Sequence, residues 1–122
     1  MNINKAPFRI AVLEAFKSKS RFRVGCVLAK GDRIISSGFN KMDKTCPTAT
    51  KNGEYSIHAE IAACRGLRPY DVAGASAYVC RILQNGALAM AGPCEMCRRV
   101  LRQMGIKKVY YSTSKGWEKE TL

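Results

Sequence analysis

Two short motifs restrict this chain more than any other feature: H-x-E at residues 58–60 and P-C-x-x-C at residues 93–97. Together they supply one imidazole, one carboxylate and two thiols. An imidazole and two thiolates make three zinc ligands, whereas a closed structural zinc site takes four protein ligands. The fourth tetrahedral position is then left for water, which zinc converts into a nucleophile at neutral pH. The fold must therefore bring His58, Cys94 and Cys97 together around one ion.

Glu60 completes the pattern, in a role different from that of the ligands. A fourth protein ligand would occupy the position that the water needs, whereas a carboxylate beside that water can accept its proton and return it. Two residues apart on a helix, His58 and Glu60 point in different directions, so one can bind metal while the other faces a substrate. We therefore predict one zinc ion per chain, held by His58, Cys94 and Cys97, with Glu60 as the general acid and base.

Apolar spacing predicts an alternation of helices and strands along the chain. The predicted helices cover residues 7–18, 58–65 and 94–104, and the predicted strands cover residues 24–29, 33–37, 75–83, 106–111 and 117–122. The first two strands should form a hairpin, because Gly31 and Asp32 provide a turn between them. A right-handed crossover through the third helix makes the strands on either side of it parallel. The last strand should pair antiparallel with the strand before it.

Residues 38–57 are predicted to form a long polar segment that leads directly into His58. A connector of this length is usually functional or disordered. Two interpretations stay open, a loop that faces the substrate and a solvated insertion. Cys46 lies in this segment and is assigned no role.

The length of 122 residues predicts a single domain over residues 1–122. A hydrophobic content of 47% provides a core that does not need disulfides, although the chain has six cysteines. The first residues lack the apolar stretch of a signal peptide, and no apolar run approaches the length of a membrane span. We therefore expect a soluble, cytoplasmic protein with no membrane contact.

The charge balance favours an anionic partner. Lysine and arginine number 21 against nine acidic residues, which gives a net charge of +12. A nucleotide phosphate and a nucleic-acid backbone would both suit such a field. The basic clusters that could track a backbone, or that could simply be solvated, are Lys17, Lys19, Arg21 and Arg23 together with Arg98, Arg99 and Arg102. Arg98 could instead offset the charge of the two thiolates.

The aromatic residues that could stack on bases, or pack in the core, are Tyr110, Tyr111 and Trp117.

Several segments of the chain resemble the cytidine and deoxycytidylate deaminase superfamily, whose zinc signature is the pair of motifs described above. The segments that carry the resemblance are residues 24–28, 37–40, 58–60, 93–98 and 105–110. The resemblance implies a three-layer α/β/α sandwich with a mixed five-stranded sheet. It implies that Glu60 activates a zinc-bound water, that Asn40 hydrogen-bonds the sugar or base, and that the backbone of Ala59 lies against the pyrimidine. It also implies a homo-oligomer.

Two departures from the family pattern bear on the substrate. His58 is the only histidine, so none remains for the second metal or the allosteric site of many deoxycytidylate deaminases. Residues 84–92 replace the T-L-E approach to P-C that is typical of tRNA adenosine deaminases, which argues mildly against adenosine.

The expected activity is hydrolysis of a cyclic amidine: deamination of cytosine to uracil in a cytidine or deoxycytidine nucleoside or nucleotide. Lys41, Lys44 and Lys51 are then candidate phosphate contacts. A second interpretation is a deaminase that edits cytosine, or with less support adenine, in single-stranded DNA or RNA. A third, of another class, is a noncatalytic nucleic-acid-binding module stabilised by zinc, which would not need Glu60.

Overall fold

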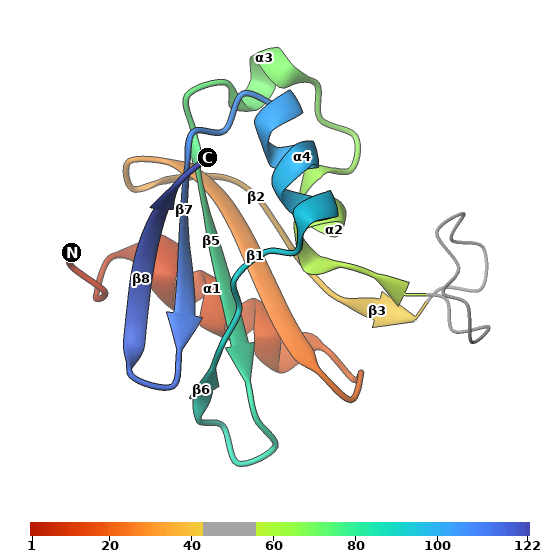
Figure 1. The fold of residues 1–122 in the computed structure, drawn as a ribbon, viewed down its shortest axis with the longest axis vertical. Helices are drawn as coiled ribbons and strands as arrows, with labels where there is room; N and C mark the ends of the chain where they lie inside the picture. Colours follow the sequence, from red (N-terminus) through yellow and green to blue (C-terminus); the bar gives the residue numbers. More distant parts are fainter. Residues whose placement is uncertain (43–55) are drawn as a thin grey trace.

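The computed structural model describes residues 1–42 and 56–122, apart from the side chains of Met42 and Ser56 (Figure 1). The helices in these ranges are α1 (Ala6–Lys17), α2 (Ala59–Cys64), α3 (Pro69–Val72) and α4 (Glu95–Gln103). The strands are β1 (Arg23–Lys30), β2 (Arg33–Phe39), β3 (Lys41–Met42), β4 (Ser56–Ile57), β5 (Ser76–Ile82), β6 (Leu88–Ala89), β7 (Lys108–Thr113) and β8 (Gly116–Thr121). Each helix and strand predicted from the sequence is present, with ends shifted by a few residues.

The main sheet has the order β2-β1-β5-β7-β8, and β6 pairs with the end of β5. The strands β5 and β7 are parallel, whereas β1 pairs antiparallel with both β2 and β5, and β8 pairs antiparallel with β7. The predicted hairpin, parallel crossover and antiparallel last strand are therefore confirmed. The short β6 is a sixth strand that the sequence analysis did not predict.

Helices cover both faces of the sheet, which confirms the three-layer sandwich (Figure 1). The helix α1 buries Phe8, Ala11 and Ala15 against strand residues that include Val27 and Tyr78. On the opposite face, α2, α3 and α4 pack on the strand residues of alternate positions, such as Cys26, Leu28, Ala77 and Val79. Successive side chains of a strand point to opposite faces, so the buried strand β1 supplies both cores.

Two glycines let the helices approach the sheet closely. A Cβ built on Gly25 would collide with the backbone of α1 at Ala11 and Ala15, and a Cβ on Gly38 would lie 2.7 Å from the nitrogen of Ala63 in α2. Gly25 is in β1 and Gly38 in β2, so each glycine faces a different helix. The height of α2 above the sheet therefore depends on the missing side chain of Gly38.

The structure adds detail that periodicity could not supply. The segment predicted as a loop has at its two ends the two-stranded ribbon of β3 and β4. His58 precedes α2 as its N-cap instead of lying in the first turn, and the four-residue α3 was not predicted. Elements of two to four residues are too short to display a repeating apolar pattern. No helix within the described ranges is long and apolar enough to cross a membrane.

Candidate active site

The three predicted ligands lie together. The Nδ1 atom of His58 is 3.3 Å from the Sγ atom of Cys97 and 3.7 Å from that of Cys94, and all three atoms lie within 4.8 Å of one another. Zinc bonds of about 2.0–2.1 Å to nitrogen and about 2.3 Å to sulfur, at tetrahedral angles, would separate nitrogen from sulfur by roughly 3.6 Å. The observed spacings bracket that value, so the donor set fits a zinc ion.

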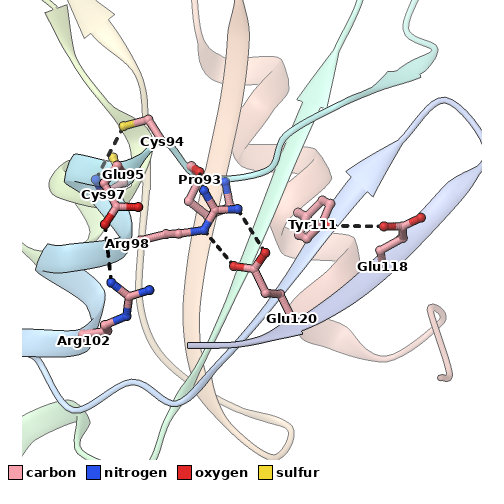
Figure 2. Close-up of polar contacts among 9 residues, drawn as sticks. All are labelled: Pro93, Cys94, Glu95, Cys97, Arg98, Arg102, Tyr111, Glu118 and Glu120. Atoms are coloured by element: carbon pink, nitrogen blue, oxygen red, sulfur yellow. Dashed lines mark hydrogen bonds and ion pairs between the residues drawn. The ribbon is translucent and has the colours of Figure 1, made fainter.

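Two helices on the same face of the sheet hold these ligands. His58 is the N-cap residue of α2, and Cys94 is the N-cap residue of α4, where its Sγ atom accepts a hydrogen bond from the backbone N–H of Cys97 (Figure 2). Cys97 is fully buried, whereas Cys94 is exposed. The positive end of the α4 dipole favours thiolates at these positions, as does a bound cation.

Glu60 lies in the first turn of α2 and is only 5% exposed. Burial raises the pKa of its carboxyl above the ordinary value, while its own backbone N–H, His58 and a hydrogen bond with the Cys97 thiol act in the opposite direction. Burial, followed by the charges of Glu60 and Cys94, raises the pKa of the Cys97 thiol. A buried carboxyl beside three metal ligands is suited to taking up and releasing protons.

A cavity of about 290 Å³ opens beside this cluster. The described residues that line it are Phe22, Val24, Asn40, His58, Ala59, Glu60, Arg81, Met90, Ala91, Gly92 and Cys94. The cavity thus brings together Glu60, which is the predicted general acid and base, two of the predicted ligands, and both predicted substrate contacts, Asn40 and Ala59. Its volume is near the lower end of the range for small-molecule sites.

Asn40 also bonds to the backbone of the neighbouring strand. Its Oδ1 atom accepts a hydrogen bond of 2.9 Å from the N–H of Val24, and its Nδ2 atom donates to the carbonyl of Phe22. Only 9% of Asn40 is exposed. The amide has one further hydrogen and one further lone pair, so contact with a substrate stays a prediction.

The three lysines predicted as phosphate contacts have different outcomes. Lys41 is exposed and lines a separate hollow of about 350 Å³ with Lys17, Lys19, Ser20 and Phe39. Lys44 and Lys51 lie outside the described residues, as does Cys46.

The basic cluster on α4 is paired with acidic side chains (Figure 2). Arg98 forms two hydrogen bonds with Glu120 of β8, of 2.7 and 3.0 Å, and also donates to the carbonyl of Pro93. Arg102 is 3.6 Å from the carboxylate of Glu95, and Arg99 is 4.0 Å from the same carboxylate. Arg98 therefore connects the cysteine segment to the last strand.

Two of the three candidate stacking residues are packed against α1. The ring of Tyr110 stacks on Tyr78 at 4.8 Å, and the ring of Phe8 meets both Tyr110 and Trp117 edge-on. Tyr111 lies on the other face of β7 and donates a hydrogen bond to Glu118. The interpretation of Tyr110 and Trp117 as packing residues is the one that the structure supports.

The sequence analysis missed Arg81 and Phe22 as cavity residues. Arg81 interrupts an otherwise apolar strand, and strand alternation places it on the same face as Val79, toward α2 and α4. That interruption was the available signal. Phe22 stands among basic residues in the sequence, with no pattern to distinguish it.

Comparisons with known proteins agree with this geometry. Residues 1–113 match the sequence model of a protein family, the "Cytidine and deoxycytidylate deaminase zinc-binding region". Deoxycytidylate deaminase of Schizosaccharomyces pombe is 31% identical over 106 residues, which cover 81% of this chain and 33% of that protein. The human deoxycytidylate deaminase is 29% identical over 120 residues, which cover 87% of this chain and 62% of the human protein. The chain therefore spans less than two thirds of these curated relatives.

Solved structures have the same fold. The dCMP deaminase of cyanophage S-TIM5 in apo form superposes with a TM-score of 0.63 at 24% identity, covering 87% of this chain and 79% of that one. The cytidine deaminase of Burkholderia pseudomallei gives 0.65 at 20% identity, covering 99% and 93%. The match over residues 1–113, together with the zinc-ligand geometry, shows that this chain belongs to the cytidine and deoxycytidylate deaminase family.

Proposed function

We propose that this chain is a zinc-dependent hydrolase that deaminates cytosine to uracil in a cytidine or deoxycytidine nucleotide. The observation that carries the proposal is the position of Glu60, buried in a cavity wall beside His58, Cys94 and Cys97. A purely structural zinc module needs no carboxylate at that position. A zinc ion held by the three ligands would supply an activated water as the nucleophile.

Glu60 performs the proton transfers in this proposal. It accepts a proton from the attacking water and delivers it to the ring nitrogen N3, and it then carries the proton of the new C4 hydroxyl group to the departing amino group. The C4–O bond forms and the C4–N bond breaks, so cytosine and water become uracil and ammonia. Phe22, Met90 and Ala91 give this cavity an apolar lining beside the reacting base.

A nucleotide is preferred over nucleic acid as the substrate. The related proteins from fission yeast and human are named deoxycytidylate deaminases, and a further S-TIM5 structure is described as a complex with dCMP and dUMP. Against a nucleic-acid track, the arginines of α4 are paired with Glu95 and Glu120, and the rings of Tyr110 and Trp117 are packed on Phe8. A homo-oligomer is proposed from the family resemblance, and the mass of the purified protein in solution tests it.

The decisive experiment replaces Glu60 by glutamine in zinc-loaded protein. With dCMP as substrate, Glu60→Gln should lose ammonia release by a factor of at least about 10²–10⁴, the usual contribution of general acid–base catalysis. Zinc content should stay at one ion per chain, because Glu60 is not a ligand. Ammonia release and metal content are measured on the same samples.

Glu14 provides a matched control. It is also a buried carboxylate, 6% exposed, but it lies on α1 and bonds to Lys17 and Ser37, away from the cavity. Glu14→Gln should keep the activity of the folded fraction. Unchanged ammonia release in Glu60→Gln would refute the role of Glu60, and loss of zinc from that variant would make Glu60 a ligand.

A further inference from the structure

We propose that Arg81 is the residue of the cavity that binds the 5′-phosphate of the substrate and thereby selects a nucleotide over a nucleoside. This inference rests on the proposed function, because it assumes that a cytosine compound enters the cavity. Arg81 was not among the residues that the sequence analysis singled out. Of the three lysines considered there, Lys41 is the one that the structure describes, and it does not line this cavity.

The position of Arg81 follows from the register of the sheet. Arg81 is near the end of β5 and pairs across the sheet with Val24 of β1. Asn40 accepts a hydrogen bond from the N–H of Val24. Asn40, Val24 and Arg81 therefore form adjacent parts of the same cavity wall. Arg81 follows Ala77 and Val79 on the face that carries α2 and α4.

Arg81 is half-buried, and its guanidinium has an Nε donor with no acceptor among the residues that the structure describes. Its Nε atom is buried without a hydrogen-bond partner, and the guanidinium carbon lies 4.8 Å from the centre of the Phe22 ring. In the part of the chain that the structure describes, no carboxylate forms an ion pair with Arg81. A buried donor without an acceptor costs free energy, and an anion bound beside the Nε atom would remove that cost.

The chemistry of arginine identifies the anion. A planar guanidinium presents parallel N–H groups that match two oxygens of a phosphate, and stacking on an aromatic ring orients the group. Among the described lining residues, Arg81 is the only lysine or arginine, and Glu60 is the only carboxylate. The cavity thus offers the carboxyl group of Glu60 for proton transfer to the cytosine ring and the guanidinium of Arg81 for a phosphate.

Arg23 is a natural comparison within the same sheet. Its Nε atom is also buried without a partner, and its guanidinium stacks on Phe16 at 5.1 Å. However, its Nη2 atom donates to the carbonyl of Phe16, and Arg23 does not line the cavity. The two arginines share burial and stacking, and they differ in access to the substrate.

The experiment compares kcat/KM for dCMP and for deoxycytidine in zinc-loaded wild type, Arg81→Leu, Arg81→Lys and Arg23→Leu. We expect Arg81→Leu to lower the ratio of the two values by about 10–100-fold, the range of a charge-assisted hydrogen bond. Arg81→Lys should retain part of the preference, because it keeps the charge and loses the fork. Arg23→Leu should leave the ratio unchanged.

A binding measurement separates failure of this inference from failure of the proposed activity. The affinity of dUMP, the product of dCMP, is measured by calorimetry in the same variants. If wild type deaminates nothing, weaker dUMP binding in Arg81→Leu and Arg81→Lys still supports the phosphate contact, and equal affinities refute it.

Three kinetic outcomes would overturn the inference. An equal loss for dCMP and deoxycytidine would make Arg81 a structural residue, and an equal effect of Arg23→Leu would point to a general property of the sheet. A loss confined to a cytosine-containing single-stranded oligonucleotide, tested as a third substrate, would assign Arg81 to a phosphodiester. If Arg81→Leu does not fold, Arg81→Lys and Arg81→Gln give the same comparison.

Discussion

At the scale of single residues, the polar groups of this site serve both the fold and the proposed chemistry. Glu60 is an example, because its carboxylate is buried among thiols. The thiols of Cys26 and Cys64 each have a raised pKa, to about 11 for Cys64, from burial and then from the negative charge of Glu60. The backbone N–H of Glu60, His58 and the Cys97 thiol favour the ionised form of Glu60, and a bound zinc ion would favour it further.

Asn40 gives the first prediction at this scale. Asn40→Ala should lower the free energy of unfolding by about 1–3 kcal/mol, because the half-buried N–H of Val24 and the carbonyl of Phe22 lose their partner. Urea denaturation of the metal-free protein measures the change. The control is Asn85→Ala, in an exposed turn where Oδ1 accepts from the N–H of Ala87, and its cost should be smaller.

The Asn40 prediction separates structure from substrate binding. If Asn40→Ala were as stable as wild type, Asn40 would act on the substrate alone. Asn40→Asp should also be destabilised, since a carboxylate would replace the amide donor that faces the Phe22 carbonyl.

At the scale of helices and strands, the metal site is a contact between the N-terminal ends of α2 and α4. The helix α4 is connected to β8 through Arg98 and Glu120, and α2 rests on β2 at Gly38. The spacing of the ligands is therefore set by how each helix sits on the sheet. Small shifts of a helix should alter metal affinity before they alter the fold.

The two close-packed glycines test this view. Gly38→Ala and Gly25→Ala should each cost about 1–3 kcal/mol of stability, because a new Cβ must push helix backbone away from the sheet. Only Gly38→Ala displaces α2, so it alone should weaken zinc binding, by roughly tenfold, as for other changes that misplace a ligand. Competition with a chelating dye measures the affinity. Equal zinc affinities in the two variants would show that the height of α2 does not set the ligand spacing.

At the scale of the whole molecule, zinc would join segments that are far apart in the sequence. His58 precedes β5 in the chain, and Cys94 and Cys97 follow it. A ligand that binds only the folded state stabilises it by mass action. The net charge of +12 adds self-repulsion that such cross-linking opposes.

Metal removal should therefore lower the melting temperature. Free zinc at a thousandfold excess over its Kd stabilises the fold by about 4 kcal/mol, which corresponds to roughly 15 °C for a chain of this size. Calorimetry with and without a chelator measures the shift. In Cys94→Ser the difference should shrink, because one ligand is lost. The same Tm with one zinc bound and with none would refute a cross-link between the two helices.

The chemistry of the site could be predicted from the sequence because it is local. Imidazole, thiol and carboxyl groups keep their properties in any fold, so H-x-E and P-C-x-x-C identified the zinc ligands before their positions were known. The same holds for the sheet: apolar runs and turn residues predicted the hairpin, the parallel crossover and the antiparallel last strand.

Other features depend on which segments meet in space. Arg81 borders the cavity because β5 pairs with β1 and delivers it beside Val24, and the amide of Asn40 is engaged because β2 ends next to the start of β1. Pairing of strands and packing of helices are long-range events that leave no periodic trace in either segment. The residue types were readable along the chain, whereas the cavity they form, with the guanidinium of Arg81 in its wall, exists only once distant backbones are in register.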